Sequence, residues 1–265
     1  MFPSRLIRRR LLVPVAALCL GLSSLAARAQ TQTQTQTLTI SAAASLTNVL
    51  KDLAPRFEAS RPGVKLQFNF AASGVLIQQI AQGAPVDVFI SADEETMSRG
   101  IAQKLLDPAS RKDIASNQVV LVVPADVTGL AKVSSVADLA APAVKRVAIG
   151  KLASVPAGRY ARQSLEAARL WAALEPRLIH ADSVRQVLDY VARGEVDAGF
   201  VYATDAAVMA DKVRVVSRVD GHDPVRYPAA LVSDGRLKPQ AADFLAFLLG
   251  ADAQATLAKA GFGRP

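Results

Sequence analysis

The chain has 265 residues, of which 51% are hydrophobic and 20% are charged, so it can bury a large core and lacks the composition of a disordered protein. Its formal net charge is +8, but residues 1–29 contain five arginines and no acidic residue. The remainder carries 26 basic and 23 acidic side chains. A balance this close to neutral does not indicate nucleic-acid binding, and we expect no nucleic-acid partner.

Residues 1–29 have the layout of a secretory signal peptide. A basic segment precedes an uncharged apolar run over 11–27, and Ala27 and Ala29 match the small residues that signal peptidase reads. We therefore predict cleavage after Ala29 and a periplasmic location. A membrane anchor is the alternative, but Pro14 interrupts the run, which is shorter than the roughly 20 residues of a spanning helix.

The only cysteine, Cys19, lies inside this leader, so we expect neither a disulfide nor a thiol nucleophile in the mature chain. Leu18 is bulkier than the small residue that usually precedes a lipid-attachment cysteine. Residues 30–37 are mostly a Thr-Gln repeat without an apolar side chain to bury, which predicts a flexible polar linker.

From Leu38 onward, short β-rich runs alternate with segments of helical periodicity, which is typical of α/β proteins built from βαβ units. The predicted strands are 38–41, 64–70, 86–90, 118–123, 146–149, 178–179, 198–201, 213–216 and 227–232. The predicted helices are 46–57, a short one from 74, one from about 93, 158–169, 184–193, and a final helical stretch from 239 towards 262.

Small or hydroxylated residues mark four strand-to-helix junctions: Ser45, Ser73, residues 155–158 and residues 182–184. The first N–H groups of a helix lack internal partners, so helix starts that converge supply hydrogen-bond donors and partial positive charge to an anion. Ligands of open α/β sheets usually bind at the carboxyl ends of the strands, where these junctions lie. Tyr202 follows the strand 198–201 and could add a phenolic donor.

Each of these residues also has a purely structural interpretation. Ser45 and Ser73 could cap their own helices, which is the commoner role of a serine at a helix start. Tyr202 could simply pack against the core.

Four segments occur in the order found in a known family: residues 42–48, 83–93, 155–160 and 201–205. They resemble the periplasmic molybdate-binding proteins of molybdate ABC transporters, and the resemblance extends over about 38–262. It implies the type II periplasmic-binding-protein fold, an α/β fold with two lobes. Each lobe would be a mainly parallel sheet flanked by helices, and two crossing strands would join them.

On this resemblance, lobe I comprises residues 38–116 and 227–265, and lobe II comprises residues 117–226. The resemblance implies hydroxyl ligands at Ser45, Ser73 and Tyr202 and backbone N–H ligands at Ala157 and Val184. The ligand would be molybdate or tungstate, with no cofactor and no metal bound as a free cation. The expected partner is a permease in the inner membrane, and we expect a monomer.

The sequence departs from the family pattern in two places. Ala72 and Gly74 flank Ser73 where relatives often have further serines, so a supporting hydroxyl is absent there. Lys151 stands where some relatives carry an acid. It either raises the local positive potential or is a solvated loop charge, and we favour the second interpretation.

The alternatives are an enzyme and a binding protein for another solute. The mature chain has two histidines, His180 and His222, and no motif for a metal, a nucleophile elbow or a phosphate loop, so we predict no enzymatic activity. An amino-acid site would use an arginine for the ligand carboxylate, a role open to Arg159 or Arg185, although such helix-start residues more often face solvent. Another anion, such as sulfate, remains possible, whereas phosphate carries a proton that these donors cannot accept.

Overall fold

The computed structural model describes residues 35–126, 133–233 and 238–265. The predicted signal peptide, Cys19 and residues 30–34 of the predicted linker lie outside the described residues. The first strand, β1, spans Gln36–Ala43, so residues 36 and 37 belong to a strand and not to the linker.

Lobe I is built on a five-stranded sheet with the order β2-β1-β3-β10-β4. Its other strands are β2 (Val64–Ala71), β3 (Val88–Ile90), β4 (Lys112–Asn117) and β10 (Val225–Leu231). Its helices are η1 (Ala44–Leu46), α1 (Thr47–Ser60), α2 (Ser73–Ala81), α3 (Glu94–Ala102), η2 (Pro108–Ser110), α8 (Pro239–Leu249) and α9 (Ala251–Lys259).

Lobe II is built on a second five-stranded sheet with the order β7-β6-β8-β5-β9. These strands are β5 (Val119–Pro124), β6 (Val147–Gly150), β7 (Leu178–Ala181), β8 (Ala198–Tyr202) and β9 (Val213–Arg218). The helices are η3 (Ala137–Ala140), α4 (Pro156–Ala167), α5 (Trp171–Leu174), η4 (Glu175–Arg177), α6 (Val184–Ala192) and α7 (Ala203–Val208).

The two sheets share one topology. In each, three parallel strands are followed by one antiparallel strand and then by a strand that pairs antiparallel with it. Four of the five strands in each sheet therefore run in one direction, although half of the neighbouring pairs are antiparallel. Most strands of each sheet thus run in one direction, as predicted. The pairing of neighbouring strands is mixed, parallel in half of the pairs and antiparallel in the other half.

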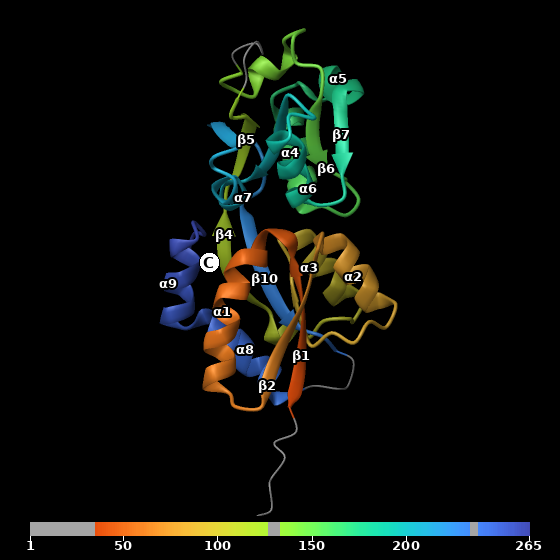
Figure 1. The fold of residues 1–265 in the computed structure, drawn as a ribbon. Coiled ribbons are helices and arrows are strands. Elements are labelled where there is room, and N and C mark those ends of the chain that lie inside the picture. The colour runs from red at the N-terminus through yellow and green to blue at the C-terminus, as the bar shows by residue number, and fades with distance from the viewer. Residues whose placement is uncertain (1–34, 127–132, 234–237) are drawn as a thin grey trace, which may run out of the picture. The chain divides into compact units, whose positions relative to one another are not determined.

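Two segments of chain cross between the lobes, near the centre of Figure 1. One runs from β4 into β5, with Gln118 between the two strands, and the other runs from β9 through residues 219–224 into β10. The predicted lobe boundaries fell after residues 116 and 226, whereas the sheets change after Asn117 and before Val225. The strand β4 itself was not predicted, because its sequence Lys-Asp-Ile-Ala-Ser-Asn lacks a β-rich pattern.

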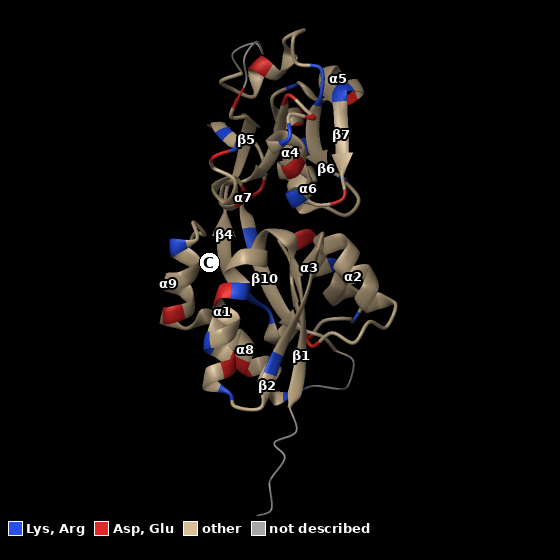
Figure 2. Cartoon of the chain, in the orientation of Figure 1, with Lys and Arg blue, Asp and Glu red and all other residues tan. Residues whose placement is uncertain are grey.

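The observed elements follow from the side chains that they bury. β5 is buried along its apolar positions 119–123 because it lies inside its sheet, between β8 and β9. Within the described residues, no single helix is long and apolar enough to cross a membrane, and only the bent pair α8 and α9 passes on length and composition. Both of these helices bury apolar side chains in the core, including Phe244 and Leu257. Basic and acidic residues are interspersed over both lobes (Figure 2).

Candidate functional site

A small cavity lies where strand-to-helix junctions of the two lobes meet. It is lined by Ala43, Ala44, Ser45, Ala71, Ala72, Ser73, Ala92, Val155, Pro156, Ala157, Val184 and Tyr202. The structure thus brings all five predicted ligand residues to one cavity. None of the lining residues is charged, so a ligand here would meet hydroxyl groups, backbone groups and apolar surface.

The cavity is small. Its volume is about 10 Å³, which is room for about one water molecule. Sugars and amino acids are much too large for this space. Its size therefore favours a compact ligand.

Ser45 lies inside η1 and Ser73 is the first residue of α2, and neither side chain caps a helix, so the capping interpretation is wrong for both. Neither α1 nor α2 has a side-chain cap hydrogen bond. Instead, the Ser73 hydroxyl oxygen accepts a hydrogen bond of 3.0 Å from the Ala92 N–H, and Ser45 Oγ lies 3.0 Å from Tyr227 Oη. Both serines are buried. A serine hydroxyl proton that is not used in these contacts therefore points to another buried group or into the cavity.

Lobe II contributes backbone N–H groups at the starts of α4 and α6. Pro156 begins α4, and its missing N–H and fixed φ suit that position. Val184 begins α6, where the Ser183 hydroxyl accepts from the Gln186 N–H at 3.1 Å and not from that of Val184. Among the described residues, no backbone hydrogen bond uses the N–H of Ala157 or Val184, as expected for the first turn of a helix.

A close contact between α4 and β6 holds the first turn of α4 in place. A Cβ atom at Gly158 would lie 2.0 Å from the carbonyl oxygen of Gly150, so only glycine permits this approach. The helix start therefore sits directly against the end of the strand, and the Ala157 N–H is fixed by the backbone.

Tyr202 is buried, and its hydroxyl has no hydrogen-bond partner among the described residues. Burial raises the pKa of Tyr202 well above its usual value, so the phenol stays protonated and can donate. Its ring packs 6.0 Å from that of Tyr227, as the packing interpretation predicts. Packing alone leaves a buried hydroxyl unsatisfied, however, which costs about 1–3 kcal/mol, and a ligand at the cavity would remove this cost.

Sequence reasoning missed three residues behind the cavity: Asn117, Asp205 and Tyr227. Asp205 is completely buried, accepts a hydrogen bond of 3.3 Å from the Tyr202 N–H and pairs with Arg185. Burial raises the pKa of Asp205 to about 6, against the opposing effect of the Arg185 guanidinium. Only the pairing of distant strands brings Asn117 and Tyr227 near Ser45, so no local sequence signal identifies them.

Arg159 and Arg185 do not face solvent as expected, because each is held by a buried carboxylate and reaches the other lobe. Arg159 of lobe II pairs with Asp93 of lobe I and donates to Thr96 Oγ1 at 2.9 Å. Arg185 pairs with Asp205 and donates to the Ser45 carbonyl at 3.2 Å. Neither guanidinium lines the cavity, so neither can bind the carboxylate of an amino acid there directly.

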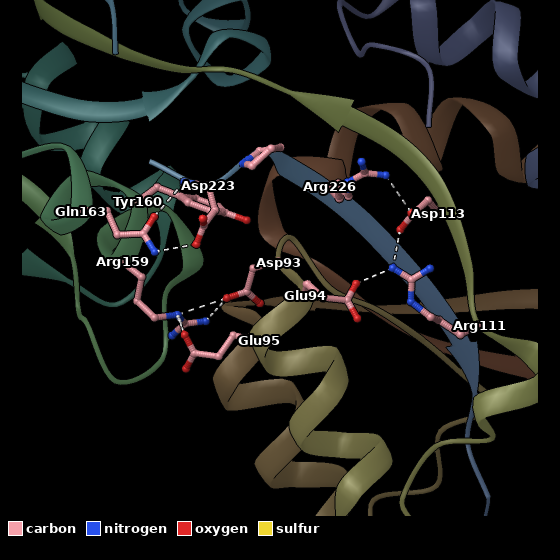
Figure 3. Close-up of a pocket in the computed structure, with 11 residues that line it drawn as sticks. Asp93, Glu94, Glu95, Arg111, Asp113, Arg159, Tyr160, Gln163, Asp223 and Arg226 are labelled. Carbon is pink, nitrogen blue, oxygen red and sulfur yellow. Dashed lines mark hydrogen bonds and ion pairs between the residues drawn. The ribbon is translucent and has the colours of Figure 1, made fainter. Parts of the chain in front are cut away.

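A larger cavity of about 430 Å³ also lies between the lobes, and Figure 3 shows its lining. Its charged side chains already satisfy one another. Arg159 points towards Asp93 and Glu95, Arg111 pairs with Glu94 and Asp113, and Gln163 donates to Asp223 at 2.9 Å. This lining offers no set of free donors comparable to that of the small cavity.

The histidines have local roles. Both ring nitrogens of His222 contact backbone carbonyl oxygens of its own turn, at 2.6 and 3.0 Å, and His180 lies exposed on β7. Within the part of the chain that the structure describes, no group of three or more His, Cys, Asp or Glu residues could hold a metal ion.

The two departures from the family pattern are now explained in part. Lys151 pairs with Asp182 and is half-exposed, which agrees with the interpretation as a solvated loop charge. Gly74 is required by a contact between the lobes, because its N–H donates to the Ser154 carbonyl at 2.9 Å and a Cβ atom there would lie 2.6 Å from Ser154 Cα.

Comparison with known proteins gives the same assignment as the four sequence segments. The family model for bacterial extracellular solute-binding proteins matches residues 38–263. The molybdate-binding protein ModA of Escherichia coli is 37% identical over 228 residues, covering 83% of this chain and 86% of that protein. ModA of Haemophilus influenzae is 35% identical over 228 residues, covering 83% of this chain and 87% of that protein.

A solved structure confirms the predicted two-lobed fold. The periplasmic molybdate-binding protein of Azotobacter vinelandii superposes with a TM-score of 0.73 at 28% sequence identity, covering 86% of this chain and 99% of that chain. The chain therefore belongs to the family of bacterial extracellular solute-binding proteins.

Proposed function

We propose that this protein captures molybdate in the periplasm and delivers it to the permease of an ABC transporter. The observation that carries the proposal is a small cavity lined by hydrogen-bond donors from both lobes, with no charged residue in its lining and with the buried Tyr202 hydroxyl unpaired among the described residues. Two curated relatives, 37% and 35% identical, bear the name molybdate-binding protein, which supports the same ligand.

The donor set favours an oxyanion that carries no proton. Hydroxyls at Ser45, Ser73 and Tyr202 and N–H groups at Ala157 and Val184 can each donate to a ligand oxygen. A carboxylate that could accept a proton from hydrogen phosphate is absent from this lining. Burial of an unsatisfied ligand hydroxyl would cost about 1–3 kcal/mol, so phosphate should bind more weakly than molybdate.

Oriented dipoles can stabilise the two negative charges without a cation in contact. The starts of α4 and α6 place partial positive charge at the cavity, and Arg185 lies behind it, paired with Asp205. Because lobe I and lobe II each contribute donors, the ligand would hold them together, and the closed form would be the one that docks on the permease.

Several finer statements belong to the same proposal. The predicted signal peptide and linker would deliver the protein to the periplasm as a monomer without enzymatic activity. Tungstate has the charge and shape of molybdate, so we propose that it binds too. Sulfate is the competing candidate, because it also carries no proton at neutral pH and differs mainly in size.

Calorimetric titration with molybdate, tungstate, sulfate and phosphate tests the proposal. Molybdate should bind most tightly or together with tungstate, and sulfate and phosphate should be weaker. Tight binding of sulfate, or failure of molybdate to bind, would overturn it. Fluorescence of Trp171, the only tryptophan, gives a second readout from lobe II.

Substitution of the hydroxyl donors tests the location of the site. Ser45→Ala and Ser73→Ala should each weaken molybdate binding by about 1.5–3 kcal/mol, the value of a hydrogen bond to a charged group. Ser98→Ala, which removes an exposed hydroxyl on α3, is the matched control and should leave binding unchanged. Wild-type affinity in both cavity variants would place the site elsewhere.

A further inference from the structure

We propose that Tyr227 and Asn117 are positioning residues that direct the hydroxyl proton of Ser45 to the ligand, and so make the site selective for oxyanions without a proton. Both residues lie on the strands that connect the lobes, β10 and β4. The inference rests on the proposed function, because it takes Ser45 to be a ligand donor. It assigns a role to the buried Tyr227 and the partly buried Asn117, both of which lie outside the cavity lining.

The direction of the hydrogen bonds is set by a backbone amide. The Gln118 N–H can only donate, and it donates to the side-chain oxygen of Asn117 at 2.8 Å. The amide group of Asn117 is therefore oriented with its nitrogen towards Thr204 Oγ1, at 2.8 Å, and Tyr227 Oη, at 3.1 Å. An amide nitrogen cannot accept a hydrogen bond, so it donates to both oxygens.

Tyr227 passes this direction on to Ser45. Its hydroxyl is completely buried, and its partners among the described residues are Asn117 Nδ2 and Ser45 Oγ. Because the oxygen accepts from Asn117 and Asn117 cannot accept in return, the single phenolic proton is donated to Ser45 Oγ at 3.0 Å. The chain of hydrogen bonds thus runs from Gln118 through Asn117 and Tyr227 to Ser45.

The proton of Ser45 is then left for the cavity. Donation by Tyr227 polarises the serine hydroxyl and makes it a better donor to an anion. If a ligand donated its own proton to Ser45 Oγ, the serine proton would lose its acceptor and become an unsatisfied buried donor. Ser73 is held in the same way, since its oxygen accepts from the Ala92 N–H, which can only donate. In lobe I, the hydroxyls of Ser45 and Ser73 are therefore both oriented to donate to the ligand, and neither is oriented to accept a proton from it.

Tyr227→Phe removes the phenolic donor and keeps the buried ring. Calorimetry should show molybdate binding weakened by about 3- to 10-fold, the net value of one neutral hydrogen bond. In the Ser45→Ala background the same substitution should cause no further loss, because Tyr227 acts through Ser45. Tyr190→Phe, the same change on α6 away from the cavity, should bind as the wild type does.

Ligand discrimination separates this role from a structural one. In Tyr227→Phe, Ser45 can rotate and accept, so the ratio of molybdate affinity to hydrogen phosphate affinity, measured by competition, should fall by about 3- to 10-fold. The ratio of molybdate to sulfate affinity should stay constant, because neither ion carries a proton. A general loss of folding or closure would lower all three affinities together.

Asn117→Asp supplies a second test if the phenylalanine variant does not fold. The new carboxylate is an acceptor, so Tyr227 would donate to it and not to Ser45. Molybdate binding should weaken at least as much as in Tyr227→Phe. In the Ser45→Ala background only the part of this loss that comes from repulsion between the new carboxylate and the anion should remain.

Additive losses in the double variants, or unchanged affinity and unchanged discrimination in Tyr227→Phe, would overturn the inference while leaving the proposed function intact. Failure of the wild-type protein to bind any of the oxyanions would overturn both.

Discussion

The two lobes have the same strand order but supply donors of different kinds at corresponding positions. Ser45 follows β1 in lobe I, and Ala157 follows the corresponding strand β6 in lobe II. In the same way, Ser73 follows β2 and Val184 follows the corresponding strand β7. At these four positions lobe I offers side-chain hydroxyls and lobe II offers backbone N–H groups, and lobe II adds the Tyr202 hydroxyl at the end of β8. The fold thus fixes where donors lie, and the sequence decides only what carries them.

This difference has a physical consequence. A backbone N–H at a helix start points along the helix axis whatever the side chain is. A hydroxyl can rotate, so its proton needs a neighbouring donor to direct it, as Ala92 does for Ser73. In the proposed site, the donors of lobe I should therefore depend on the residues behind Ser45 and Ser73, and those of lobe II on the geometry of the starts of α4 and α6.

The third junctions of the two lobes also differ, and they give the largest expected effect. Asp93 of lobe I pairs across to Arg159, whereas Asp205 of lobe II is completely buried beside Arg185 in its own lobe. Burial raises the pKa of Asp205 from 3.8 to about 6, so folding favours the protonated form. The contribution of Asp205 to stability is present below the unfolded pKa and is lost as pH rises through about 6.

The free energy of unfolding of the wild type relative to Asp205→Asn should therefore fall by up to about 3 kcal/mol between about pH 4 and pH 7. Denaturant titrations of both proteins at several pH values measure this difference, and other carboxylates cancel because both proteins contain them. A difference that rises with pH would mean that pairing with Arg185 outweighs burial.

Gly74→Ala tests whether the lobes must meet as closely as they do here. The new Cβ atom would lie 2.6 Å from Ser154 Cα, a backbone atom of lobe II, so the closed form should be disfavoured by about 1–3 kcal/mol. Molybdate affinity should fall by the corresponding factor of about 5 to 150. Alanine is a better helix former than glycine, so thermal unfolding without ligand should be unchanged or shift upward. A parallel loss of stability would instead indicate damage within lobe I.

Val184→Pro removes one backbone donor of lobe II while keeping its helix. Proline suits the first position of a helix, and Ser183 before it already has an extended backbone with φ of −155°. Molybdate binding should weaken by about 1.5–3 kcal/mol because a donor to a buried charge is lost. Val184→Ala keeps the N–H and is the matched control, with a clearly smaller effect in the same titration. Equal losses would show that the side chain matters and the amide does not.

The sequence predicted the order of elements well because each strand and helix carries its own periodic pattern. The apolar run of β5 and the helical faces of α4 and α6 are local signals. β4 was missed because its pairing with β10 gives it strand structure that its own residues do not favour. The shared topology of the lobes was also invisible, since similar strand orders require no similar sequences.

Residues of the candidate site could be predicted where resemblance and helix-start patterns coincide, as at Ser45 and Val184. The groups behind them could not, because Tyr227 reaches Ser45 across 182 residues of chain. The solvent-facing expectation for Arg159 and Arg185 was wrong for a related reason. Helix-start position predicts exposure only when no second lobe covers the helix, and buried carboxylates hold both guanidinium groups here.

The smallest expected effect concerns Lys151, the residue that departs from the family pattern in lobe II. Lys151 and Asp182 are both well exposed, so their pair should contribute less than about 1 kcal/mol and should be screened by salt. Lys151→Ala should therefore change molybdate affinity by less than about 2-fold at physiological ionic strength, although the residue follows β6 close to the start of α4. A larger loss that disappears at high salt would show instead that this charge raises the potential at the cavity. Lobe II would then hold the anion by the charge of the Lys151 side chain as well as by its backbone N–H groups. The contrast between side-chain donors in lobe I and backbone donors in lobe II would be weaker than the geometry indicates.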